Sequence, residues 1–175
     1  PGKVSSPAEV SSPAEVNSPA EVNSPAEELS DDEISKIIGK VNASGTITDE
    51  QAESLSKVEI LNLNGLTSIT NEQAESLIND ELFNKVEELE LNGLTSITNV
   101  QAESLGKIHD LWLNGLTSIN DEQAKGLADS ANNLQLNGLA SLTDEQVEIL
   151  SNYRARRALG LDGLTSITDK QAESL

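Results

Sequence analysis

Residues 58–77, VEILNLNGLTSITNEQAESL, carry two patterns that together predict the fold. In the first half of this stretch Leu61 and Leu63 alternate with polar residues, and this period of two predicts a short strand with one buried face. In the second half Gln73 stands three residues after Thr70. In this capping-box spacing each side chain satisfies a backbone N–H group of the other residue, so it predicts the first turn of a short helix.

The helix-start phrase recurs along the chain. It begins at Ile47 as ITDEQAESL, and close relatives begin at Ile69, Ile97, Ile119, Leu142 and Ile167, at intervals of 22, 28, 22, 23 and 25 residues. A strand–turn–helix unit of about 23 residues cannot bury its apolar face alone, whereas a stack of such units can. The sequence therefore predicts an α/β solenoid with a parallel sheet on one side and short helices on the other.

An Asn-Gly pair follows four of the predicted strands and is typical of a turn that needs a residue with positive φ. We expect the Asn side chains to bond turn backbone and to stack from repeat to repeat. A structural role, rather than ligand binding, is therefore predicted for this set. Its members are Asn64 and Gly65, Asn92 and Gly93, Asn114 and Gly115, and Asn137 and Gly138.

The repeated pattern resembles leucine-rich repeats, above all the cysteine-containing subclass, with Gln-Ala in place of that subclass's Gly-Leu. The resemblance covers residues 47–175 and extends weakly to 29–46, interpreted as a degenerate N-terminal capping repeat, while the array is cut inside a repeat at Leu175. It implies a curved solenoid whose strands line a concave face that binds partners. The family's cysteine position is held by Leu66, Leu94, Leu116, Leu139 and Leu164.

Residues 1–28 form a separate low-complexity segment in which the phrase Ser-Pro-Ala-Glu-Val recurs every six residues. Its apolar side chains are Ala and Val alone, which is too little to offset the entropy of ordering. Proline also favours extended backbone. We therefore expect an extended or disordered linker that precedes the array at 29–175.

Composition excludes several classes of function. The chain carries 11 basic and 30 acidic residues, a net charge of −19, which argues against binding to nucleic acid or to an anionic membrane surface. No stretch approaches the 18 or so apolar residues of a membrane span, so no membrane insertion is expected. With no Cys and with His109 as the single His, thiolate and poly-His metal sites are excluded, and we expect no metal and no cofactor.

No catalytic motif is present, so the chain is expected to be non-enzymatic. His109 and Asp110 are adjacent, and on a strand they would point to opposite faces and form no dyad. The predicted function is binding of a protein partner or another ligand by the acidic concave face, and the acidic side chains favour a basic partner. The residues expected there are Trp112, Glu88, Glu90, Asp110, Asn62 and Gln135.

Several alternatives stay open. Trp112 is expected to be solvent-exposed, either as an interface anchor or as a chance aromatic. The array could instead serve as a structural stalk or surface-layer segment that self-associates through its open C-terminal edge. The repetitive linker and the acidic surface favour a bacterial cell-surface or secreted protein.

Two local features interrupt the regular repeats. Arg154, Arg156 and Arg157 are expected to lie in a solvated loop, with contact to an acidic partner as the alternative. Leu82 and Phe83, inside the longest interval, are expected to add a buried helical turn.

Overall fold

The computed structural model describes residues 2, 29–78, 85–128, 133–151 and 158–175. The predicted linker (apart from Gly2), the insertion with Leu82 and Phe83, and the arginine cluster therefore lie outside the described residues. Within the described part, seven helices and five strands follow one another. They are α1 (Asp31–Ser44), α2 (Asp49–Leu55), β1 (Ile60–Asn62), α3 (Asn71–Ile78), β2 (Glu88–Glu90), α4 (Asn99–Leu105), β3 (Asp110–Trp112), α5 (Asp121–Ala128), β4 (Asn133–Gln135), α6 (Asp144–Ser151), β5 (Ala158–Gly160) and α7 (Asp169–Ser174).

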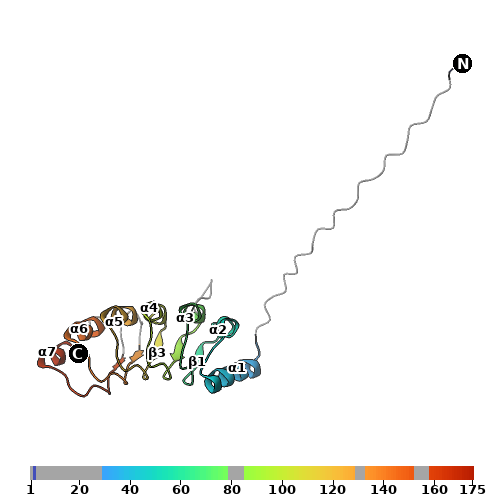
Figure 1. Ribbon diagram of the computed structural model, residues 1–175. Helices are drawn as coiled ribbons and strands as arrows, with labels where there is room; N and C mark the ends of the chain where they lie inside the picture. The colour runs from blue at the N-terminus through green and yellow to red at the C-terminus, as the bar shows by residue number, and fades with distance from the viewer. Residues whose placement is uncertain (1, 3–28, 79–84, 129–132, 152–157) are drawn as a thin grey trace.

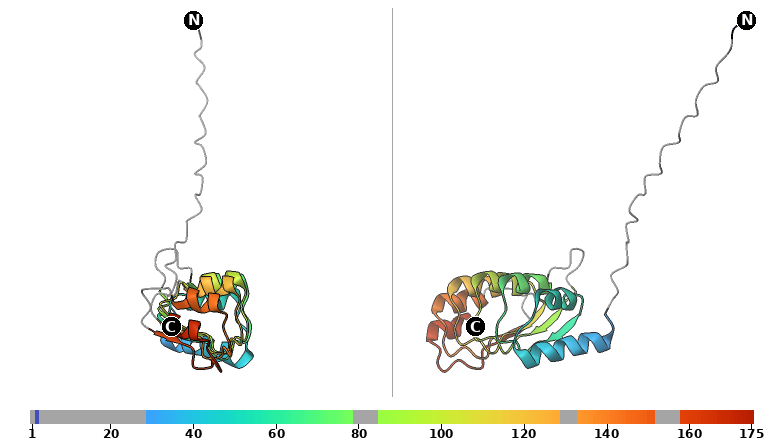
Figure 2. Two further views of the ribbon diagram at one scale, coloured as in Figure 1. Left: turned by 90° about the vertical axis from the view of Figure 1, so that its left-hand side faces the viewer. Right: turned by 45° about the vertical axis from the view of Figure 1, so that its right-hand side comes forward.

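The five strands form one parallel sheet in the order β1-β2-β3-β4-β5. The register repeats without a shift, so the central leucine of each strand lies beside the central leucine of the next. The helices α2–α7 form a second layer beside the sheet (Figure 1). In the view onto the C-terminal end, successive coils lie behind one another (Figure 2). The prediction of an α/β repeat solenoid with short strands and short helices is confirmed.

The core is a stack of aliphatic side chains repeated once per coil. In the first full coil Leu61, Leu63 and Leu66 face inward beside Ala52 and Leu55 of the preceding helix, and all five are fully buried. Burial of one such leucine contributes about 1.5–3 kcal/mol before the entropy of ordering is subtracted. No coil buries this core by itself, because each inner leucine row is covered by the rows on either side of it.

The Asn residues that follow the strands form a hydrogen-bonded ladder along the solenoid. The Oδ1 atom of Asn64 accepts from the backbone N–H of Asn92 at 3.0 Å, and Asn92 does the same for Asn114 at 2.9 Å. Asn114 then accepts from Asn137, and Asn137 from Asp162. The predicted hydrogen bonds from Asn side chains to the backbone of the next repeat are thus present. Each satisfies a turn N–H group that has no partner in the strand pairing.

The expectation of positive φ after these asparagines was wrong. Among the described residues only Gly45 has a positive φ. A Cβ atom at Gly115 would instead overlap the backbone carbonyl oxygen of Asn92, and one at Gly138 would overlap that of Asn114. Glycine is needed there because neighbouring coils approach backbone to backbone, not because the turn is left-handed.

The capping boxes carry a second contact that links the coils. At α5, the Gln123 Oε1 atom accepts from the Asn120 backbone N–H at 2.8 Å, which completes the predicted box. The Nε2 atom of Gln123 also donates to the carbonyl oxygen of Ile97 in the preceding coil at 2.6 Å. The same second bond is made by Gln73, Gln101, Gln146 and Gln171.

Helix α1 covers the N-terminal end of the stack. Its Val41 is fully buried against the first coil. Its Asn42 donates from Nδ2 to the carbonyl oxygen of Asn62 at 3.0 Å and accepts at Oδ1 from the Gly65 N–H at 2.8 Å. One helix therefore supplies the apolar contact and the ladder contact that a preceding coil would supply.

The glutamine contact predicts a difference between two otherwise similar substitutions. Gln123→Glu keeps the acceptor of the capping box but removes the donor to Ile97, so we expect a loss of about 1–3 kcal/mol in the free energy of unfolding. Gln51→Glu is the matched control, because the Gln51 amide makes its capping contact without a bond to an earlier coil in the described structure. Urea unfolding measures both. Equal losses in the two variants would contradict a linking role for Gln123.

The box at α1 predicts a local effect of pH. Glu33 Oε2 accepts from the Ser30 hydroxyl at 2.7 Å and from its backbone N–H at 3.0 Å, and these two bonds hold the pKa of Glu33 below its usual range. A lowered pKa stabilises the folded state above the unfolded-state value, and this stabilisation is lost as pH falls through the folded value. We expect faster amide exchange in α1 in acid, corrected for intrinsic rates, and a weaker pH dependence in Glu33→Gln. Unchanged α1 protection on acidification would contradict this.

Candidate functional site on the strand face

The side chains on either side of each central leucine point away from the core and form two columns, here called the strand face. The central, inward-facing residue is leucine in all five strands, whereas the two outward-facing residues change from one strand to the next. Residues that vary in this way, within an array of near-identical repeats, are not required for packing one coil against the next. The columns are Ile60, Glu88, Asp110, Asn133 and Ala158, and Asn62, Glu90, Trp112, Gln135 and Gly160.

Two carboxylates face each other across neighbouring strands in the middle of this face. Glu88 of β2 is in register with Asp110 of β3, and both are partly exposed. Neighbouring strands lie about 4.8 Å apart, and like charges directly opposite each other destabilise a sheet. The pair therefore favours any cation that lies between or above the two carboxylates.

Glu90 is held in place by two side-chain amides. Its Oε2 atom accepts from Asn62 Nδ2 at 3.1 Å and from Asn64 Nδ2 at 2.6 Å. The Asn64 side chain therefore makes two kinds of bond: its Oδ1 accepts from the Asn92 backbone in the ladder, and its Nδ2 donates to Glu90 on the strand face. The structure brings Asn62 and Glu90 together, and it gives Asn64 a second contact that no sequence pattern predicts.

Trp112 lies between Glu90 and Gln135 in the second column. It points away from the core, as the alternation predicts, but it is partly buried rather than fully exposed. Gln135 is fixed by its neighbours, since its Nε2 donates to Asn133 Oδ1 at 2.6 Å and its Oε1 accepts from Asn137 Nδ2 at 3.3 Å. Trp112 therefore lies among hydrogen-bonded polar side chains, with the carboxylate of Glu90 on the neighbouring strand.

The expectation that His109 and Asp110 lie apart was wrong. His109 Nδ1 is 3.5 Å from Asp110 Oδ1, and the side chains are 49% and 32% exposed. Alternation fixes only the direction in which each side chain leaves the backbone. The His109 carbonyl oxygen accepts from the Asn133 N–H at 3.2 Å, yet the longer His109 side chain turns back towards the carboxylate of Asp110. The contact places an imidazole ring at the edge of the acidic pair.

Comparison of the chain with models of protein families, with curated proteins and with solved structures finds no match. Across the described ranges, no group of three or more His, Asp or Glu side chains is placed to hold a metal ion. Of the helices that the structure describes, none has the length and apolar character to cross a membrane. The case for a binding surface therefore rests on the geometry of the strand face.

The partial burial of Trp112 predicts its response to two quenchers. Neutral acrylamide should quench Trp112 emission in the folded chain less than in the denatured chain, because part of the ring is covered. Iodide should quench it less than acrylamide does, because the nearby carboxylates repel the anion, and added inert salt should narrow that gap. Emission that neither quencher reaches in the folded chain would contradict this placement. As a control, Glu88→Gln/Asp110→Asn should raise quenching by iodide and leave acrylamide quenching unchanged.

Proposed function

We propose that the array is a leucine-rich-repeat solenoid that acts as a non-enzymatic binding module for a protein partner. The repeat frame, the in-register parallel sheet and the single helical layer support this assignment. The strand face is the proposed binding surface, because its residues differ from strand to strand while the inward residues repeat. The proposal assigns neither a reaction nor a cofactor to the chain.

The observation that carries the proposal is the in-register pair Glu88 and Asp110 beside Trp112. A Lys or Arg side chain between the two carboxylates would relieve their repulsion. The Trp112 ring would add a cation–π contact, which contributes about 0.5–2 kcal/mol. Arg suits this arrangement best, since its planar head can bond a carboxylate and stack on the ring at once.

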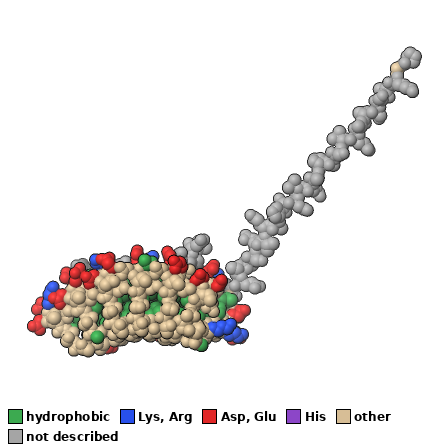
Figure 3. All heavy atoms as spheres, viewed as in Figure 1, with side chains coloured by type: hydrophobic (Ala, Val, Ile, Leu, Met, Phe, Trp, Pro, Cys, Tyr) green, Lys and Arg blue, Asp and Glu red, His purple; other side chains and the backbone are tan. Residues whose placement is uncertain are grey.

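The charge of the whole molecule supports a basic partner. A net charge of −19 attracts a cationic protein over long range and speeds its encounter, and this effect falls as salt screens it. Carboxylates are also abundant on the helix layer, where they form a red band along the upper edge of Figure 3. A specific strand-face contact must therefore be separated from this general attraction.

A matched pair of variants makes that separation. Glu88→Gln/Asp110→Asn removes two charges from the strand face, and Glu53→Gln/Glu103→Gln removes two exposed charges from α2 and α4. With a labelled hexa-arginine peptide as the probe, we expect the first variant to weaken binding about tenfold and the second by less than about twofold. Fluorescence anisotropy at fixed ionic strength measures both.

Trp112→Ala provides the second arm of this experiment. It should weaken binding of hexa-arginine by about two- to tenfold, the range that a cation–π contact at a partly exposed site supplies. Thermal unfolding controls for loss of structure in each variant. If the strand-face and helix-face variants lose affinity equally, the binding reflects net charge alone and the proposal is wrong.

A further inference from the structure

The strand face carries one exposed apolar side chain beside its acidic pair. Ile60 of β1 is 59% exposed, and of the large apolar side chains that the described structure leaves exposed it alone lies on this face. Its neighbour in the same column is Glu88, and the next residue in that column is Asp110. The column therefore runs from an apolar position to two carboxylates across three successive strands.

Packing within the chain does not account for Ile60. The next residue, Leu61, is fully buried on the core side of the sheet, whereas Ile60 lies on the opposite side. The same column holds Asn133 in β4 and Ala158 in β5, so the coil does not require an apolar side chain there. A single exposed apolar residue is common on protein surfaces, and the feature that distinguishes Ile60 is its spacing from the acidic pair.

That spacing matches an extended peptide laid across the strands. Neighbouring strands lie about 4.8 Å apart, so Ile60 is about 7.2 Å from the midpoint between Glu88 and Asp110 along the column. In an extended peptide, side chains two residues apart project to the same side and are separated by about 6.8 Å. A peptide that places one side chain on Ile60 therefore places the side chain two positions away between the carboxylates.

We propose that the strand face recognises an extended segment of its partner in which an apolar residue stands two positions from an Arg or Lys. This specificity rests on the proposed function, because it uses the same acidic pair, and it adds Ile60 as a specificity-determining residue. The basic side chain lies between Glu88 and Asp110, and the apolar side chain covers Ile60. The residue between them points away from the sheet, so its identity is not read.

The apolar contact supplies a selectivity that charge cannot. A net charge of −19 attracts basic proteins of every sequence, and salt screens this attraction. Burial of apolar surface on Ile60 acts only at contact and does not depend on charge. Two contacts at a fixed spacing therefore separate one kind of basic segment from the others.

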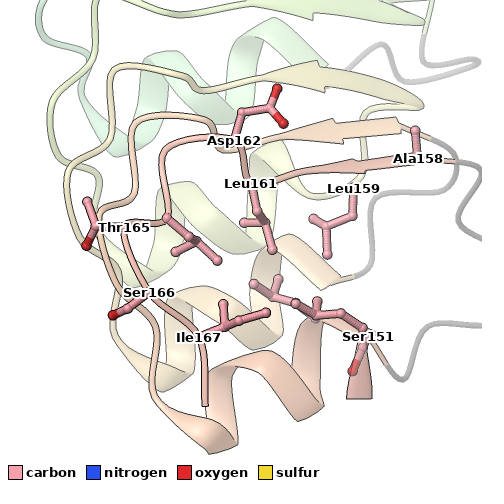
Figure 4. Close-up of a pocket in the computed structure, with 11 residues that line it drawn as sticks. Ser151, Ala158, Leu159, Leu161, Asp162, Thr165, Ser166 and Ile167 are labelled. Atoms are coloured by element: carbon pink, nitrogen blue, oxygen red, sulfur yellow. The ribbon is translucent and has the colours of Figure 1, made fainter. Parts of the chain in front are cut away.

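A hollow beside β5 is a different kind of surface. Leu159, Leu161 and Ile167 point into it (Figure 4). The counterparts of the two leucines in the preceding coil, Leu134 and Leu136, are fully buried where that coil packs against the next. The hollow therefore consists of stacking positions and contributes no side chain to the acidic pair or to Ile60.

Three labelled peptides test the spacing on the full 175-residue chain. They are Leu-Ser-Arg-Ser-Arg-Ser-Arg, Ser-Leu-Arg-Ser-Arg-Ser-Arg and Ser-Ser-Arg-Ser-Arg-Ser-Arg. The first two have the same composition, but the leucine of the first is an even number of positions from every arginine and that of the second an odd number. We expect the first to bind about three- to tenfold more tightly than the second, and the second to bind like the third. Fluorescence anisotropy at fixed ionic strength measures all three.

Ile60→Ser should remove this preference. Its affinity for the first peptide should fall to that for the second, while its affinity for hexa-arginine should stay within about twofold of the unaltered chain. Because Ile60 is exposed, thermal unfolding should not change. Val100→Ser is the matched control, since Val100 is 49% exposed on α4, and this variant should keep the preference.

Equal binding of the first two peptides, or a preference that Ile60→Ser leaves intact, would overturn the role of Ile60. So would a dimer in sedimentation equilibrium that Ile60→Ser dissociates, because a second copy of the chain would then cover this residue. The two proposals fail separately. Hexa-arginine binding that stays specific to the strand face, with no preference between the peptides, rejects only the role of Ile60, whereas equal losses in the strand-face and helix-face charge variants reject the proposed function itself.

Discussion

Each coil depends on the coil before it for hydrogen bonds that it cannot make alone. The N–H of Asn114 bonds the Asn92 side chain, and the Gln123 amide bonds the carbonyl of Ile97. Both contacts satisfy backbone groups that would otherwise be left without partners beside a packed aliphatic core. Leucine burial supplies the driving force, but these bonds fix the register, because a coil shifted by one residue would lose its row of bonds along with its leucine contacts.

This constraint explains which residues repeat and which vary. Inward leucines, the Asn column, the glycine after it and the capping glutamine all touch a neighbouring coil, and a change at any of them affects two coils. The outward strand residues contact a neighbouring coil through backbone pairing, which any of these residue types can make, and through side chains such as those of Asn62 and Glu90. They can therefore carry Glu88, Trp112 or Gln135 without disturbing the stack, which makes the strand face the part of the sheet able to acquire specificity.

Much of this arrangement was readable from short-range patterns. Alternation around Leu61 predicted the strand, and the spacing of Thr70 and Gln73 predicted the helix start, because both signals depend on residues close in sequence. The repeated Asn predicted bonding between repeats. What escaped prediction depends on the distance between coils: the contact that excludes a Cβ at Gly115, the second bond of Gln123, and the use of Asn42 on α1 in place of a coil.

The features of the candidate site also fall into those that the sequence predicted and those that it did not. Alternation predicted that Glu88, Asp110 and Trp112 share one face, and the register makes them neighbours. It could not predict that Asn64 also holds Glu90, because that bond crosses 26 residues and depends on a side-chain rotamer. Nor could it predict that His109 Nδ1 and Asp110 Oδ1 lie 3.5 Å apart, because that contact depends on the rotamers of two neighbouring side chains. The sequence pattern therefore predicts the face on which a side chain lies, and the rotamer decides which neighbour on that face it contacts.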